Sequence, residues 1–128
     1  MLGKRDSTLY GTRSMEQIVL DLQRAYPNIC FTYYQSNHEG DLIDRLQSVS
    51  KNDYQGIILN AGGYTHTSVS LRDAVELTAA PVIEVHLSDI RIRENFRRIS
   101  LLTDVAETVY YGNHCYEEAT RHIISTAH

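Results

Sequence analysis

The chain has 128 residues, of which 42% are hydrophobic, and its 12 basic and 16 acidic side chains give a formal charge of -4 with the six histidines neutral. A chain of this length is expected to form one domain around a single core, and its apolar share excludes a largely disordered protein. The acidic balance argues against a nucleic-acid-binding protein, which normally carries a basic excess that neutralises phosphates.

The two cysteines, Cys30 and Cys115, lie far apart and supply neither a disulfide framework nor a four-thiolate zinc site. The histidines include no His-Glu-x-x-His motif, so we expect no metal site. No apolar run approaches the roughly 20 residues needed to cross a bilayer, and the first residues hold no signal-peptide core. We therefore expect a soluble, unprocessed cytoplasmic protein without a membrane partner.

The first part of the chain alternates loop, helix and strand patterns. Residues 3–13 contain two glycines and mixed charges without a period, which predicts a mobile loop. Ser14 can then cap a helix with an apolar face, and Gln17 occupies the capping-box position. The aromatic and branched residues of 29–35 predict a strand, and Asn37 starts a second helix.

The rest of the chain continues this alternation. The expected elements are a strand at 56–60, a turn at 61–67, a helix at 69–77, a strand at 81–86, an arginine-rich stretch at 88–100, a strand at 108–111 and a helix at 116–124. The continuous apolar run at 56–60 is typical of a parallel strand covered on both faces. The pattern predicts a parallel α/β sandwich with a ligand site outside the carboxyl ends of its strands.

Polar side chains at the strand ends are candidates for that site. Asn60, two glycines and His66 lie at a strand-to-helix turn, where backbone N–H groups can receive an anion; an ordinary turn of this kind is the alternative. Glu84 and His86 are two residues apart in a strand and point the same way, so the carboxylate could set the tautomer and basicity of the imidazole. A structural histidine is the alternative for His86.

Arginines are concentrated in one short stretch, at positions 91, 93, 97 and 98. Arg93 and Arg97 would share one face if this stretch is helical, which suits a carboxylate clamp, while a solvated helix face is the alternative. Tyr10 lies five residues after Arg5 in the predicted loop, and by itself it could equally be a surface aromatic.

Four motifs in order resemble those of the type II 3-dehydroquinate dehydratases, or type II dehydroquinases. They are LGKRDSTLYG at 2–11, QSNHEGDLID at 35–44, ILNAGGYTHTSVSLRDA at 58–74 and PVIEVHLSDIRIRENFRRIS at 81–100. The resemblance implies a flavodoxin-like three-layer sandwich with a parallel sheet, formed by one domain over residues 1–128. It also implies reversible dehydration of 3-dehydroquinate to 3-dehydroshikimate through an enolate-type intermediate, as in the shikimate pathway, without a metal or organic cofactor, in a dodecamer of four trimers.

The resemblance also gives each candidate residue a role. Tyr10, in the loop at 3–13, looks like the general base that takes the C2 proton, with Arg5 stabilising its anion. His86 looks like the general acid that protonates the departing C1 hydroxyl, and Glu84 orients it. The other implied roles are Asn60 and His66 for the ring hydroxyls, Leu87 and Ser88 for the carboxylate, Arg97 for the ring, Arg93 for the electrostatics of the tyrosine, and Asp73 for the site of a neighbouring subunit.

The chain departs from the family pattern at its start. Family members have an apolar strand and a Gly-Pro-Asn-Leu-Asn motif before the Leu-Gly-Lys-Arg that stands here at 2–5. We therefore expect the sheet to lack its first, central strand, which forfeits on the order of 8 to 15 kcal/mol of burial, and the natural product to start upstream of Met1. The alternative to the enzyme is a catalytically impaired flavodoxin-like module that binds a small polyhydroxy carboxylate.

Overall fold

The computed structural model of the chain describes residues 14–50, 52–62, 64–87 and 100–126. It divides into two compact units, residues 1–35 and residues 36–128. No helix in the described ranges is both long and apolar enough to span a membrane.

The first unit contains the helix α2 (Met15–Ala25). Ser14 caps it as predicted, because its hydroxyl accepts a hydrogen bond from the backbone N–H of Gln17 at 3.1 Å. The Gln17 side chain does not accept from the backbone N–H of Ser14, so the capping box is not formed; its amide N–H donates to Asp21 one turn further on, at 2.8 Å. The apolar face of α2 is confirmed by Ile18 and Leu22, which are both buried.

The strand predicted at 29–35 is wrong. These residues form no strand, and the sheet that the structure describes contains only segments from the second unit. Tyr33 and Tyr34 are 44% and 46% exposed. Aromatic and branched residues favour extended backbone, but a strand also needs the repeated hydrogen bonds of a ladder with a neighbouring backbone, and the described sheet does not include this segment.

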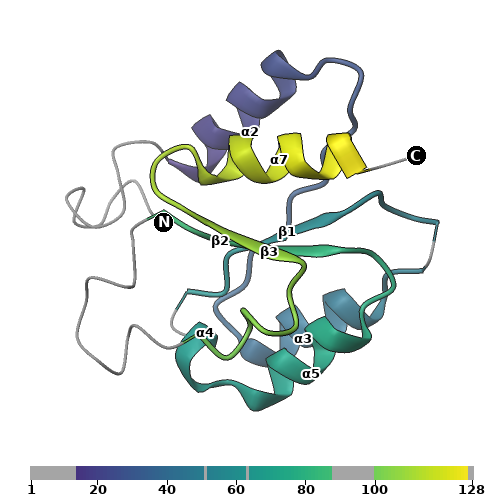
Figure 1. The fold of residues 1–128 in the computed structure, drawn as a ribbon, viewed down its shortest axis with the longest axis vertical. Helices are drawn as coiled ribbons and strands as arrows, with labels where there is room; N and C mark the ends of the chain where they lie inside the picture. The colour runs from purple at the N-terminus through teal and green to yellow at the C-terminus, as the bar shows by residue number, and fades with distance from the viewer. Residues whose placement is uncertain (1–13, 51, 63, 88–99, 127–128) are drawn as a thin grey trace. The chain divides into compact units, whose positions relative to one another are not determined.

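The second unit contains a parallel sheet with the order β1-β2-β3. Its strands are β1 (Ile57–Leu59), β2 (Val82–His86) and β3 (Thr108–Tyr111), and its helices are α3 (Glu39–Gln47), α4 (Tyr64–Thr67), α5 (Val69–Leu77) and α7 (Cys115–Thr126). Helices α3 and α5 lie on one side of the sheet and α7 lies on the other (Figure 1). The prediction of a parallel α/β sandwich is confirmed, although α3 begins two residues later than expected.

The register of the sheet makes β2 its central strand. Leu59 of β1 pairs with Glu84, and His86 pairs with Tyr111 of β3. All five residues of β2 are buried, whereas the residues before Leu59 in β1 are only half-buried. In the described sheet β1 is therefore an edge strand, which explains why its apolar run is less covered than the sequence predicts.

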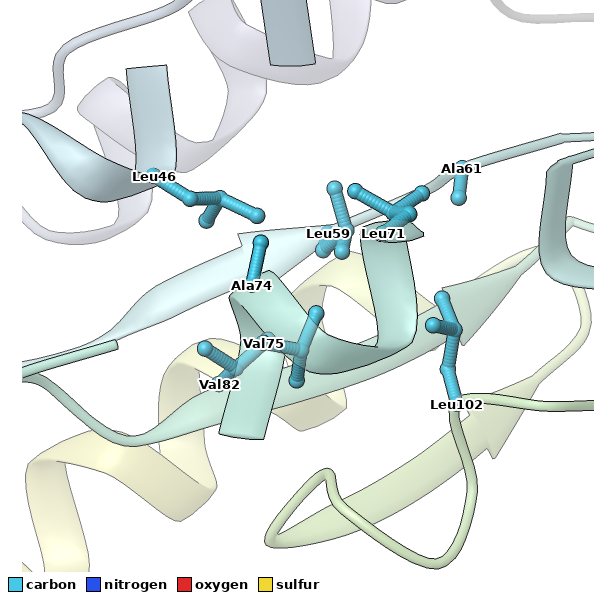
Figure 2. Packing of buried hydrophobic residues seen from close by; sticks show 8 residues of the cluster. All are labelled: Leu46, Leu59, Ala61, Leu71, Ala74, Val75, Val82 and Leu102. Atoms are coloured by element: carbon cyan, nitrogen blue, oxygen red, sulfur yellow. The ribbon is translucent and has the colours of Figure 1, made fainter. Parts of the chain in front are cut away.

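One buried hydrophobic cluster lies between the sheet and the α3–α5 side. It joins one residue of α3, three of α5, one each of β1 and β2, one of the turn after β1 and one of the segment after residue 99. Figure 2 shows the cluster Leu46, Leu59, Ala61, Leu71, Ala74, Val75, Val82 and Leu102. Leu71 and Leu102 are completely buried, and each stabilises the fold by about 1.5 to 3 kcal/mol. Packing of Leu102 fixes the chain that follows residue 99 against the strands.

Candidate active site

Two ionisable side chains meet at the carboxyl end of the central strand. Glu84 and His86 of β2 are 1% and 5% exposed, and their side chains lie on the same face because strand residues repeat every second position. The distance from Nε2 of His86 to Oε2 of Glu84 is 2.5 Å. The predicted carboxylate–imidazole pair is therefore present and removed from solvent.

Two hydroxyl groups also donate to the same carboxylate. Ser100 donates through Oγ to Oε2 at 2.6 Å, and Thr103 donates through Oγ1 to Oε1 at 2.8 Å. Burial favours a raised pKa for Glu84, but the hydrogen bonds from His86, Ser100 and Thr103, together with the charge of His86, outweigh burial and lower that pKa below its ordinary value. Glu84 is consequently an anion at neutral pH.

The ionised carboxylate determines which nitrogen of His86 holds a hydrogen. A carboxylate only accepts hydrogen bonds, so Nε2 must carry the N–H that points to Glu84. Within the described part of the chain, Nδ1 has no hydrogen-bond partner. The ring is further fixed by Tyr111, whose ring stacks on it at a centroid distance of 5.5 Å and an angle of 18°. Nδ1 is thus the atom available for proton exchange.

The turn after β1 holds Asn60 in a defined orientation. Its Oδ1 accepts from the backbone N–H of Gly62 at 3.2 Å, and its Nδ2 donates to the hydroxyl of Tyr116 at 3.3 Å. Gly62 has φ +58°, which favours glycine. The sequence suggested free N–H groups at this turn, but the N–H of Gly62 is already used by the Asn60 side chain. No described residue accepts the second N–H of the Asn60 amide, which can act as a donor.

The structure brings only some of the predicted site residues together. Because β1 and β2 are parallel neighbours, Asn60 and His86 both lie at the carboxyl ends of the strands. The buried Leu87 follows β2 directly. Asp73 is exposed on α5 and makes no hydrogen bond or ion pair with any described residue. His66 belongs to the short helix α4, but its side chain falls outside the description.

The remaining predicted site residues lie outside the described ranges. They are Arg5, Tyr10, Ser88, Arg93 and Arg97, and with them the loop at 3–13. Their roles stay predictions.

Four residues of this site were missed from the sequence: Ser100, Thr103, Tyr111 and Tyr116. A buried carboxylate requires donors, so the sequence indicated a need for hydroxyl groups near Glu84. It did not indicate which residues would supply them, because Ser100 and Thr103 are 16 and 19 positions further along. Tyr111 could have been found only from the register of β3 against β2.

The arrangement is suited to moving a proton. A buried anion stabilises a neighbouring imidazolium, which can release a proton from Nδ1 and remain hydrogen-bonded through Nε2. No group of three His, Cys, Asp or Glu side chains in the described ranges could hold a metal ion. The fold and this pair together define an α/β protein with an acid–base site at the carboxyl end of its central parallel strand.

Comparison with known proteins identifies the family. The family described as dehydroquinase class II matches residues 1–124. A 3-dehydroquinate dehydratase of Bordetella avium is 44% identical over 128 residues, which are 97% of this chain and 89% of that protein. Another from Exiguobacterium sp. is 48% identical over 113 residues, covering 88% and 77%. The crystal structure of a type II dehydroquinase from Butyrivibrio crossotus matches with TM-score 0.89 and 36% identity, covering 96% of this chain and 88% of that one. The chain belongs to the class II dehydroquinase family.

Proposed function

We propose that the chain catalyses the reversible loss of water from 3-dehydroquinate to give 3-dehydroshikimate, as a hydro-lyase of the shikimate pathway. The names of its relatives support this activity. The observation in the chain itself that carries it is the buried Glu84–His86 pair, in which one imidazole nitrogen is held by a carboxylate and the other has no described partner.

In the proposed mechanism, His86 is the general acid. Tyr10 removes the C2 proton as a tyrosinate, with Arg5 stabilising its negative charge, and an enolate forms. The electrons of the enolate then expel the C1 hydroxyl, which leaves as water with the proton from Nδ1 of His86. Glu84 balances the charge of the imidazolium before transfer, and afterwards keeps the neutral ring in the tautomer that has hydrogen on Nε2.

Substrate binding is proposed for the groups that surround this pair. The Asn60 amide is oriented by two hydrogen bonds, and its second N–H can bind a ring hydroxyl. The backbone of Leu87 can bind the carboxylate. His66, Ser88, Arg97 and Arg93 keep the roles that the resemblance implies for them. No cofactor is required by these steps.

An oligomer is proposed from the exposed face of α5. Val69 and Leu77 are 61% and 83% exposed, and with Asp73 they fall within about 80° of one helix face. Two apolar side chains on either side of a carboxylate suit an interface between subunits, through which Asp73 would reach a neighbouring site. A dodecamer of four trimers, located in the cytoplasm, is the assembly that we propose.

The finer architecture is also a proposal. We infer one catalytic domain over residues 1–128, which the family match over 1–124 supports, and a flavodoxin-like sandwich that lacks its first, central strand. Two observations support the missing strand: β1 is an edge strand of the described sheet although its sequence is typical of an interior one, and the strand-like segment 29–35 is not part of that sheet.

The function is tested by adding 3-dehydroquinate to the full chain and following the ultraviolet absorbance of the conjugated enone. We expect turnover by the natural sequence and its loss in His86→Ala and Tyr10→Phe. His122→Ala is the matched control, because His122 also pairs with a glutamate, Glu107, at 2.7 Å. Near-normal turnover in His86→Ala or Tyr10→Phe would overturn the mechanism. Calorimetric binding of a substrate analogue without turnover by the natural sequence would favour the binding module.

A further inference from the structure

The carboxylate of Glu84 has more hydrogen-bond donors than are needed to orient one histidine. Oε2 accepts from both His86 and Ser100, and Oε1 accepts from Thr103. We propose that Ser100 and Thr103 are positioning residues that keep Glu84 ionised through the whole proton cycle of His86, and thereby fix Nδ1 as the atom that gives and receives the proton. This inference rests on the proposed function.

The hydroxyl of Ser100 can point its hydrogen in only one useful direction. Its oxygen accepts the backbone N–H of Leu102 at 3.1 Å, which occupies a lone pair and leaves the single O–H for the carboxylate. The donation to Oε2 is short, 2.6 Å, as expected for a hydrogen bond to an anion. Ser100 is therefore a fixed donor to the same oxygen that holds His86.

The backbone holds both hydroxyls in place. The N–H of Leu101 donates to the carbonyl of Thr65 at 2.8 Å, and Leu102 between the two hydroxyl residues is completely buried. A hydrogen bond from Glu107 N to Val82 O, at 2.8 Å, fastens the chain further on to the start of β2. Ser100 and Thr103 thus belong to a segment whose backbone is hydrogen-bonded to Thr65 near its start and to Val82 near its end, which keeps both hydroxyls beside the Glu84 carboxylate.

The need for these donors changes during the cycle. Before proton transfer, the imidazolium and the carboxylate are a buried pair without net charge. After transfer, the pair carries one negative charge away from solvent, and the hydroxyls are then the carboxylate's remaining strong donors besides the neutral ring. Without them the buried anion is costly, and the Nε2 hydrogen can pass to Glu84, which leaves His86 in the wrong tautomer.

The surroundings of the pair provide no other charge for this purpose in the described ranges. The only charge that acts on the Glu84 carboxyl there is that of His86. The paired neighbours on β1 and β3 are Leu59 and Val109, which are apolar, and the titratable ring in contact with His86 is that of Tyr111. The two neutral hydroxyls are thus the groups, besides the His86 ring, that stabilise the negative charge of Glu84 in the described part of the chain.

The test uses Ser100→Ala and Thr103→Val in the full chain, with 3-dehydroquinate as substrate. Removal of a donor destabilises the negatively charged state of the pair most, so the pair holds its proton more tightly and is a weaker acid. We expect kcat to fall about tenfold for each variant with KM nearly unchanged, and the basic limb of the pH profile of kcat to move up by about one pH unit.

The controls separate this role from a merely structural one. Thr103→Ser retains the hydroxyl and should restore both kcat and the profile. Thr120→Val removes another buried hydroxyl, one that donates to the carbonyl of Tyr116 at 2.8 Å, and should leave the profile in place. Thermal unfolding reports the stability of each variant. If Ser100→Ala does not fold, the comparison of Thr103→Val with Thr103→Ser tests the positioning role by itself.

The outcomes distinguish this inference from the proposed function. Turnover by the natural sequence, its loss in His86→Ala and an unmoved profile in Ser100→Ala and Thr103→Val would overturn the positioning role alone. Turnover that survives in His86→Ala would instead overturn the mechanism on which this role rests. A shifted profile that Thr103→Ser restores supports the inference.

Discussion

Replacement of Glu84 by glutamine separates the charge of the buried carboxylate from its shape. The amide can place its carbonyl oxygen where Oε2 lies, so that His86 and Ser100 still donate to it. Its NH2 group then faces Thr103, whose hydroxyl can rotate to accept. The substitution is therefore compatible with the observed packing, and it removes the negative charge beside the imidazole.

The size of the effect follows from the hydrogen bond to the imidazole. A hydrogen bond to a charged group contributes about 1.5 to 3 kcal/mol and a neutral one about 0.5 to 1.5, so the imidazolium loses about 1 to 2.5 kcal/mol of support. Because the general acid must carry its proton in order to act, the smaller population of imidazolium in the variant lowers kcat by about 5- to 70-fold, with little change in KM because His86 acts on the leaving group. The assay is the ultraviolet absorbance of the enone product.

Glu107→Gln is the control for this experiment. It removes the carboxylate of the pair that Glu107 forms with His122, which lies outside the site, so kcat should be unchanged. The reasoning is refuted if Glu84→Gln keeps the natural kcat, or if its loss of activity is confined to KM.

Glu84→Gln should also change how the free energy of unfolding depends on pH. The folded-state pKa of Glu84 is lowered below its ordinary value of 4.5, so its ionisation stabilises the fold above that pH, and this contribution is lost as the pH falls through the folded value. The glutamine variant lacks it. The difference in free energy of unfolding between the two proteins should therefore shrink below pH 4.5, as measured by urea unfolding, and a constant difference would contradict the assignment.

Three further predictions concern the fold. Ser68→Ala removes the N-cap of α5 and a hydrogen bond to a glutamate of α3, and urea unfolding should show a loss of about 1 to 2 kcal/mol. Gly56→Ala would place a Cβ 2.7 Å from two side-chain atoms of Ile123, which should cost about 1 to 3 kcal/mol and be partly relieved by Ile123→Ala, as double-mutant unfolding would reveal. Burial raises the pKa of the Cys115 thiol to about 12, so iodoacetamide at pH 8 should modify the exposed Cys30 and spare Cys115, as read by mass spectrometry.

The sequence was informative wherever structure depends on nearby residues. The N-terminus of α2 was predictable because the serine that caps it stands directly before the apolar repeat. The strand Thr108–Tyr111 was predicted at its observed bounds, since branched and aromatic residues occur there in a short run. The meeting of Glu84 and His86 was also predictable, because the two-residue period of a strand is a local property.

Non-local pairing explains what could not be predicted. The residues at 29–35 have the composition of a strand, but whether they form one depends on a partner that the local sequence does not contain. The position of β1 at the edge of the described sheet has the same origin. The donors to Glu84 come from a different connection of the chain, and the stacking of Tyr111 on His86 depends on the register of two strands.

The central place of β2 has a consequence for how the protein folds. Ile57 pairs with Val82, and Ile83 pairs with Thr108, so each partner lies about 25 positions away and both pairings require closure of a long connection. Contacts of this kind form slowly and late. The hydroxyls of Ser100 and Thr103 belong to the second of these connections, between β2 and β3. A chain that has paired only β1 with β2 therefore has Glu84 and His86 but lacks the two hydroxyl donors to the Glu84 carboxylate. Catalytic competence should therefore appear at the end of refolding, together with the complete sheet.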